Sequence, residues 1–353
     1  MARLPRGEVI DPNEVAIVHA FNRTVRRCFL FGDDPLTGKN FDHRKVWIEE
    51  SLEHFAACFA IDLLSFSILS NHYHLILRNR PDVVATWSDT EVARRWLMIC
   101  PVRKIRGKPA IPTESELNSI RNCPLKLAKI RARLSDISWW MRLLNQRIAQ
   151  RANREDEASG RFFEDRYKAV PLIDESAVLA CTAYVELNPI RAAIAETLEQ
   201  SEHTSVKRRI RSIKAENAEA TECKRAKLAD SFLAPVELNE ASGDVGPCVS
   251  RSSARCSDKG FLPMTREAFI ELLDWTARQR GSGKRGATSK SAPPILARLG
   301  LSPSVWSQLV ADFGRLFPTL AGLPEHVDAA RSRRTHRRFH LSRQARELLQ
   351  HAA

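Results

Sequence analysis

The chain has 353 residues, which is enough for a sizeable core and for two domains. Its hydrophobic content of 43% and charged content of 27% are ordinary for a soluble globular protein. The 55 Lys and Arg residues outnumber the 42 Asp and Glu residues, so the formal net charge is +13 and the pI is near 9.7. Such a field attracts polyanions, and nucleic acid is the first of these to consider.

A membrane surface is the rival polyanion, but no apolar run reaches the roughly 18 residues that a spanning helix needs. The best candidate, residues 55–69, is interrupted by Asp62. The N-terminus lacks an apolar signal core, so we expect a cytoplasmic protein that does not associate with membranes. The eight cysteines include no Cys-x-x-Cys pair, which argues against a zinc ribbon and predicts free thiols.

The first predicted elements are a strand and a helix. Residues 15–21 are rich in β-forming types and predict a strand that leads into a basic turn at residues 22–27. After a loop, apolar residues recur at helical spacing and predict a helix from about Asp42. Either Asp42 or Asn40 can cap its first turn.

Two strands then carry a pair of histidines. The apolar run predicts strands at 61–69 and 72–78 with a tight turn between them. Because successive strand side chains point to opposite faces, His72 and His74 project together while Tyr73 faces the other way. Two imidazoles on one face can ligate a divalent metal, or they can simply be half-exposed residues of an amphipathic strand. Strand, helix, strand, strand is half of a ferredoxin-like α+β sandwich.

The middle of the chain is less regular. Residues 82–133 predict an insertion of short helices, whose basic residues belong either to a solvated surface or to a nucleic-acid contact. A helix capped by Ser135 follows, and we expect Trp139 and Trp140 in its core face rather than as a platform for stacking bases. Residues 161–170 alternate bulky and charged positions, which predicts a fourth strand.

The next helix, predicted over residues 174–188, carries the most informative tyrosine. The chain has three tyrosines. Tyr73 faces away from the histidines and Tyr167 lies in a strand whose neighbours look structural, so Tyr184 remains as the candidate nucleophile. Asn188 lies one turn later, before a second helix that begins at Pro189, and its carboxamide oxygen can ligate a hard cation. A core tyrosine and a helix cap are the alternative roles of these two residues.

The C-terminal part changes in composition. Residues 213–258 are polar and rich in Ala, Glu and Ser, which predicts a mostly disordered linker. Residues 259–353 predict a small helical accessory domain with a helix capped by Thr265. This region contains a Gly-rich connector at 281–286, which lacks the phosphate-loop pattern, and a basic patch at 331–338 that could contact nucleic acid.

Three sequence blocks together carry a resemblance to a known family. They are Ser70-Asn-His-Tyr-His-Leu-Ile-Leu77, Gly160-Arg-Phe-Phe-Glu-Asp-Arg-Tyr-Lys168 and Ala183-Tyr-Val-Glu-Leu-Asn-Pro-Ile-Arg-Ala192. In this order they resemble the single-tyrosine HUH transposases, and most closely the branch of REP-associated tyrosine transposases. The resemblance covers roughly residues 10–200. It implies a catalytic domain over residues 1–212 with the HUH transposase fold, in which helices pack on a ferredoxin-like antiparallel sheet.

The resemblance also implies the chemistry. In that family two histidines and a polar residue four positions after the tyrosine bind Mg²⁺ or Mn²⁺, which implies His72, His74 and Asn188 as ligands. The tyrosine attacks single-stranded DNA and leaves a 5′-phosphotyrosine and a free 3′-hydroxyl, which implies Tyr184 as nucleophile. Three features depart from the family pattern: Ser70 stands where proline is frequent, the insertion separates the blocks widely, and Asn replaces the Gln ligand of other branches.

Partners and further contacts follow from the same similarity. Family members recognise a DNA hairpin near the cleavage site and many act as dimers, so we expect single-stranded and hairpin-forming DNA as partner and a homodimer as assembly. Surface charge is the alternative role of the residues that could grip phosphates. These DNA-binding candidates are Arg161, Arg166, Lys168 and Arg191, with Asn22 and Arg23 after the first strand.

The sequence therefore predicts a metal-dependent enzyme that cleaves and rejoins single-stranded DNA near hairpin repeats. One rival interpretation is a catalytically inactive, domesticated DNA-binding protein of the same fold. Another is a replication initiator or relaxase with the same chemistry. The presence of both histidines and Tyr184 argues against the first rival, whereas a single tyrosine does not exclude the second.

Overall fold

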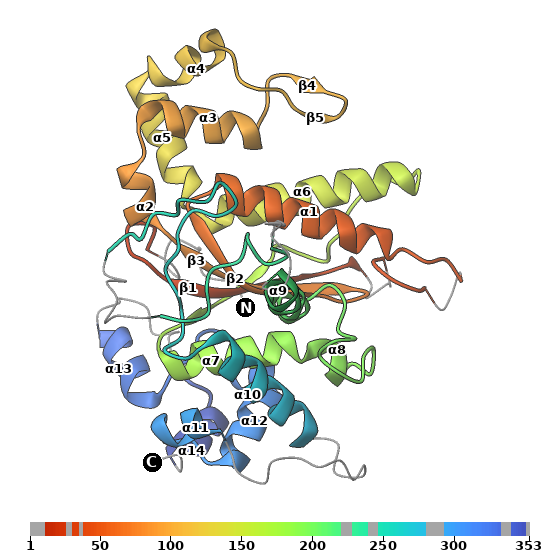
Figure 1. Cartoon of the computed structure of the whole chain (residues 1–353), viewed down its shortest axis with the longest axis vertical. Coiled ribbons are helices and arrows are strands. Elements are labelled where there is room, and N and C mark those ends of the chain that lie inside the picture. Colours follow the sequence, from red (N-terminus) through yellow and green to blue (C-terminus); the bar gives the residue numbers. More distant parts are fainter. Residues whose placement is uncertain are drawn as a thin grey trace.

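The centre of the molecule is a four-stranded antiparallel sheet with the order β2-β3-β1-β6 (Figure 1). The computed structural model describes residues 11–25, 30–34, 38–219, 228–238, 246–279, 293–332 and 340–350. The sheet strands are β1 (Ile17–Arg23), β2 (Ile61–Ile68), β3 (His72–Asn79) and β6 (Lys168–Leu172). Helices cover both faces, which confirms the predicted α+β class.

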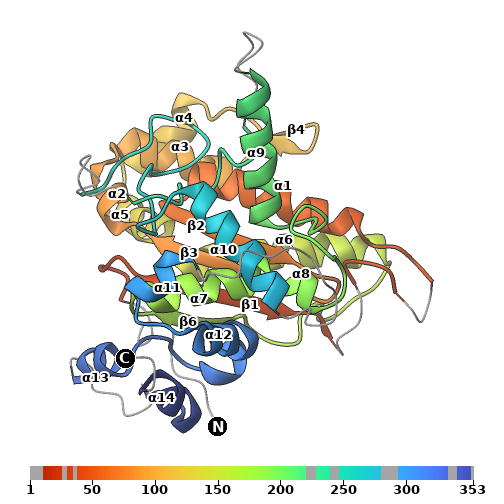
Figure 2. The ribbon, with the colours of Figure 1, turned by 60° about the horizontal axis from the view of Figure 1, so that its bottom comes forward.

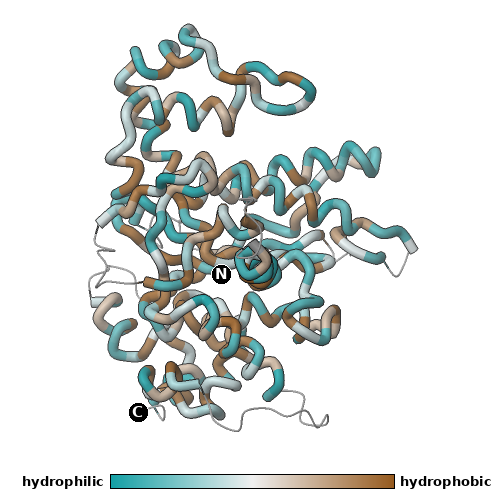
Figure 3. The backbone as a smooth tube through the Cα atoms, viewed as in Figure 1, coloured by the Kyte–Doolittle hydropathy of each residue, from teal (hydrophilic) through white to brown (hydrophobic). Residues whose placement is uncertain are grey.

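Two long helices, α1 (His43–Cys58) and α6 (Ile137–Glu155), cover one face of the sheet (Figure 1). Hydrophobic residues concentrate in the strands and on the helix sides that face them (Figure 3). Phe55, Phe59 and Trp140 pack with ring centroids 5.2–5.3 Å apart between these helices. Tyr73 points into this core, so the histidines of β3 face the other side of the sheet.

Two predicted details of this layer differ in the structure. Asp42 stands at the start of α1 but makes no capping bond and instead pairs with Lys45 at 2.7 Å. Asp136, not Ser135, caps α6 by accepting a hydrogen bond from a backbone amide. At the start of α1 the amides of Arg44 and Lys45 bond to the backbone carbonyls of Phe41 and Asp42 instead of to a capping side chain.

The predicted fourth strand is shorter than expected and begins only at Lys168. Phe162 and Phe163 are consecutive in sequence, yet both are buried in the core of the α1 and α6 layer beside Phe31. Neighbouring strand residues would point to opposite faces, so burying both on one side requires an irregular backbone. Residues 161–167 are therefore a loop that carries charged side chains toward β1.

The insertion after β3 consists of short helices, and most of it lies beyond the layer of α1 and α6, on the side away from the sheet (Figure 1). It also contains a small hairpin whose turn has Arg106 and Gly107 at positive φ. Its elements are α2 (Pro81–Thr86), α3 (Asp89–Ile99), β4 (Lys104–Ile105), β5 (Lys108–Pro109), α4 (Glu114–Arg121) and α5 (Pro124–Leu134).

The second face of the sheet is covered by α7 (Glu175–Glu186), which Asp174 caps through a hydrogen bond from the Ala177 amide. Almost every residue of α7 is buried, because the C-terminal helices cover its outer side (Figure 2). The remaining helices are α8 (Asn188–Arg191), α9 (Ser205–Glu219), α10 (Arg266–Gln279), α11 (Pro294–Arg298), α12 (Pro303–Leu316), α13 (Pro324–Ser332) and α14 (Arg343–Gln350). The C-terminal region thus shares one core with the sheet and is not a separate unit. No described helix is long and apolar enough to cross a membrane.

The described parts of residues 213–258 also differ from the predicted disordered linker. They continue α9 to Glu219 and then bury Phe232, Leu233, Ala234 and Val236. The amide of Ala234 bonds to the carbonyl of Leu63 in β2. The predicted linker residues 220–227 and 239–245, the connector at 281–286 and positions 333–338 of the basic patch lie outside the described residues.

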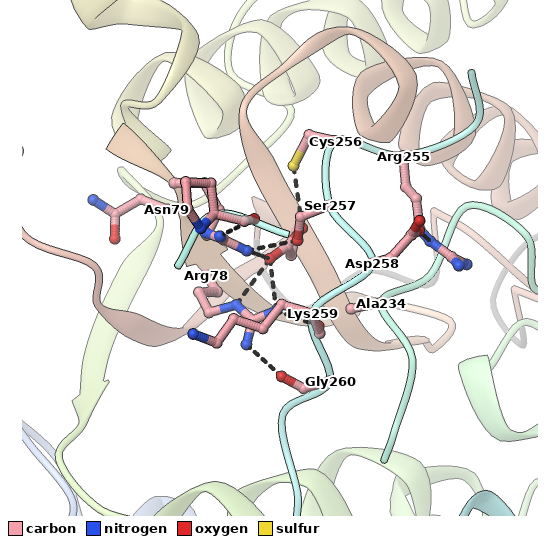
Figure 4. A network of polar contacts seen from close by, with 12 residues as sticks. Arg78, Asn79, Ala234, Arg255, Cys256, Ser257, Asp258, Lys259 and Gly260 are labelled. Carbon is pink, nitrogen blue, oxygen red and sulfur yellow. Dashed lines mark hydrogen bonds and ion pairs between the residues drawn. The ribbon is translucent and has the colours of Figure 1, made fainter. Parts of the chain in front are cut away.

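A buried polar network ties residues 246–260 to the sheet (Figure 4). Asp62 forms ion pairs with Arg78 at 2.7 Å and with Arg80 at 3.1 Å. The Cys256 thiol and the Ser257 hydroxyl donate to the other carboxylate oxygen at 3.1 and 2.8 Å. The polar composition of this segment predicted disorder. In the structure some of these polar residues are instead hydrogen-bond partners of the buried charges on the sheet, and buried charges require such partners.

Candidate functional site

Three histidines share the α7 face of the sheet. In the antiparallel register Phe21 of β1 lies opposite His74, so His19, two residues earlier, is diagonal to it on the same face. The Nε2 of His19 and the Nδ1 of His74 are 2.8 Å apart, and the two rings stack with centroids 5.0 Å apart. The rings of His72 and His74 are also 5.0 Å apart, as their strand spacing predicts. Sequence reasoning missed His19, although its alternation within residues 15–21 places it on the face of Ile17 and Phe21.

Tyr184 faces this group from α7. Its ring centroid lies 5.5 Å from that of His74 and 6.0 Å from that of His19. The guanidinium of Arg191 lies 4.7 Å from the tyrosine ring, and Phe313 of α12 packs against the ring at 5.6 Å. Burial raises the pKa of the Tyr184 phenol, whereas the positive charge of Arg191 acts in the opposite direction.

A cavity of about 590 Å³ opens at this place. Most of the catalytic, metal-binding and DNA-binding candidates line this cavity, although they come from four separate parts of the sequence. The candidates in its wall are Asn22, Arg23, His72, His74, Arg166, Lys168, Tyr184 and Arg191. The wall also contains residues that sequence reasoning did not name, namely His19, Glu164, Asp165 and Arg315.

Two candidates do not line this cavity. Arg161 is exposed on the loop before β6. Asn188 is buried at the start of α8, and within the described part of the chain its amide nitrogen has no hydrogen-bond partner. Asn188 is therefore close to Tyr184 in sequence but does not line the cavity that contains the two histidines.

The three imidazoles are electrically neutral at pH 7. Burial lowers the pKa of His19 to about 3, and burial together with Arg23 lowers that of His72 to about 4. Burial, reinforced by the neighbouring His72 and His19, places the pKa of His74 well below its ordinary value. Neutral imidazoles keep a lone pair for a metal ion.

The donor set can be compared with the metal that the sequence resemblance implies. The Nε2 of His74 is buried and has no hydrogen-bond partner among the described residues, which is the state of a ligand atom that awaits a cation. His72 and His74 therefore fit a divalent cation that accepts nitrogen ligands, such as Mn²⁺. Within the described ranges no group of three or more His, Cys, Asp or Glu side chains is arranged to hold a metal ion.

The neutral histidines predict an acid-sensitive fold. The pKa values of about 3 for His19 and 4 for His72 lie below the ordinary 6.5, so between pH 6.5 and 4 the unfolded chain binds more protons than the folded chain. The free energy of unfolding should therefore fall as the pH falls through this window, by up to about 1.4 kcal/mol per pH unit for each histidine. Urea unfolding in EDTA from pH 7.5 to 4.5 measures this slope. A His19→Phe variant should show a shallower slope, and equal slopes would contradict the prediction.

No protein-family model and no curated protein matches the chain. Among solved structures, that of a REP-associated tyrosine transposase bound to a REP hairpin resembles it with 10% sequence identity and a TM-score of 0.35. The match covers 60% of this chain and 86% of that chain. Because the likeness is this distant, we base the functional proposal on the residues of the cavity.

Proposed function

We propose that the protein is a tyrosine-dependent DNA strand transferase that cleaves and rejoins single-stranded DNA next to hairpin-forming repeats. The observation that carries this proposal is the convergence of Tyr184 with His72 and His74 in one basic cavity. A buried tyrosine beside neutral imidazoles and several guanidinium groups suits attack on a phosphodiester, because the cations bind its charge and the phenol supplies an oxygen nucleophile.

Each residue of the cavity then has a defined task. The oxygen of Tyr184 would form a bond to phosphorus while the bond to the 3′ oxygen breaks, leaving a 5′-phosphotyrosine and a free 3′-hydroxyl. Arg191, which already lies over the tyrosine ring, would orient the phenol and favour its deprotonated form. Arg23 and Lys168 would hold the DNA backbone at the ends of β1 and β6.

A divalent cation, Mn²⁺ or Mg²⁺, would withdraw charge from the scissile phosphate when bound. His72 and His74 would hold it, and the buried carboxamide of Asn188 is the proposed third ligand. The strand order β2-β3-β1-β6, with α1 and α6 on one face, follows the ferredoxin-like connectivity expected for an HUH enzyme and supports this assignment. A homodimer and a cytoplasmic location complete the proposal.

The test is a covalent adduct assay. The protein is incubated with 5′- and 3′-labelled hairpin oligonucleotides carrying single-stranded flanks, taken from repeats that flank its gene, with Mn²⁺, Mg²⁺ or EDTA. We expect an adduct that survives SDS, retains only the 3′-side label and is absent in EDTA. An adduct that carries the other label would indicate a 3′-phosphotyrosine and contradict the proposed polarity of cleavage. Binding without any adduct on all hairpins would favour the inactive DNA-binding protein.

A further inference from the structure

A second cavity, of about 470 Å³, adjoins the catalytic one. It lies between the first half of α6 and the loop at residues 163–167. Asn22, Asp165 and Arg166 line both cavities, so the two spaces share a wall. Its volume is within the range of pockets that bind small organic groups, about 300–1,000 Å³. A polymer that occupies the catalytic cavity can therefore place a neighbouring unit in the second one.

Asn22 supplies an unused hydrogen-bond donor in that shared wall. The side chain is only 6% exposed, and its Oδ1 accepts a hydrogen bond from the Arg23 amide. Its Nδ2 has no partner in the described part of the chain. Buried amide donors are nearly always paired, so this unpaired donor, on a side chain that lines both cavities, is a candidate partner for an acceptor on a ligand.

The remaining wall is aromatic and cationic. Both Trp139 and Trp140 were predicted to lie in the core. Trp140 is fully buried there, whereas Trp139 is only partly buried and lines this cavity. The guanidinium of Arg142 lies 4.9 Å from the Trp139 ring and also lines the cavity. The hydroxyl of Tyr167 donates a hydrogen bond to that of Ser138 at 3.1 Å. This bond links the loop at residues 163–167 to α6 in the wall of the cavity.

We propose that this second cavity binds one unpaired nucleobase of the DNA strand whose scissile phosphate lies in the catalytic cavity. The inference rests on the proposed function. Planar aromatic and guanidinium groups bind the faces of unstacked bases, and amide groups such as Asn22 and Asn145 bind their edges. A bare phosphate would need the cations but not Trp139, and an apolar ligand would not need Arg142 or the amide groups. The site selects which nucleotide stands next to the cleaved bond.

The test is a binding scan that does not require cleavage. A fluorescent hairpin oligonucleotide with a mixed-sequence single-stranded flank is titrated with the full chain carrying Tyr184→Phe. In a set of probes each flank base is removed in turn, leaving an abasic sugar. We expect the affinity to fall about 5- to 100-fold at one position, which is the range of base stacking on protein side chains. In a chain that also carries Trp139→Leu, removal of that same base should cost nothing further.

Trp47 provides the matched control. It is also partly buried on the helical layer and also carries an arginine, because Arg151 lies 3.8 Å from its ring, but it lines neither cavity. Trp47→Leu should leave the abasic profile unchanged. If Trp139→Leu fails to fold, Arg142→Ala replaces it as the test variant and Arg151→Ala becomes the control. Both arginines are exposed on α6, so neither substitution should disturb folding.

The outcomes separate the two proposals. A flat abasic profile in a chain whose unmodified form makes the adduct overturns the base pocket and leaves the strand transferase intact. A peak that persists in both Trp139→Leu and Arg142→Ala also overturns the pocket, because the base is then read elsewhere. A single peak abolished by these variants, in a protein that makes no adduct, supports the pocket and rejects the catalytic proposal. Failure to bind any probe contradicts both.

Discussion

Replacing Tyr184 by Phe should reduce formation of the covalent DNA adduct by a factor on the order of 10³ or more, because the change removes the oxygen that we propose as the nucleophile. The substitution deletes one oxygen and keeps the ring that packs against His74 and Phe313. DNA affinity and thermal stability should therefore change little. Adduct yield on denaturing gels and affinity by fluorescence anisotropy measure the two properties separately.

Tyr73→Phe is the matched control for this experiment. Tyr73 is flanked by the two histidines in sequence but is fully buried on the other face of the sheet, where its hydroxyl donates to Asn145. Losing that bond should lower the free energy of unfolding by about 1 kcal/mol and leave the adduct yield within a few-fold of the original. An adduct that survives Tyr184→Phe would show that Tyr184 is not the nucleophile, and equal loss in Tyr73→Phe would contradict an effect specific to Tyr184.

Replacing Asp62 by Asn should lower the free energy of unfolding by about 3–5 kcal/mol, the largest stability effect that we expect from one polar substitution. Burial alone would raise the pKa of Asp62, but Arg78 and Arg80 hold it below its ordinary value, so the carboxylate is charged at neutral pH. Without that charge the two buried guanidinium groups lose a shared partner. Urea unfolding measures the loss, and hydrogen exchange should show faster exchange first in residues 246–260, which the network holds.

Asp274→Asn is the control for this prediction. Asp274 pairs with Arg278 at 2.7 Å, but both side chains are about half exposed, at 48% and 49%. An exposed pair of this kind contributes at most about 1 kcal/mol. If the two substitutions destabilise the protein equally, the buried network does not anchor residues 246–260 to the sheet.

Local patterns were sufficient for the elements that depend on neighbouring residues. Alternation along one strand placed His72 and His74 on the same face, and the helix signals around Asp174 and Pro189 bounded the element that carries Tyr184. The strand, helix, strand, strand order likewise predicted the α+β class. In each case the physical cause is the fixed repeat of a strand or helix, which acts over a few residues.

The sequence by itself determined the α+β class, the pair of histidines on one strand face and the helix that presents Tyr184. Only the tertiary structure decided that His19 contacts His74, because that depends on the register between two strands. It also decided that Phe313, far along the chain, packs on Tyr184, and that polar residues near 257 satisfy buried charges near Asp62. Such pairings are set by which distant surfaces become buried together, and no local periodicity encodes them.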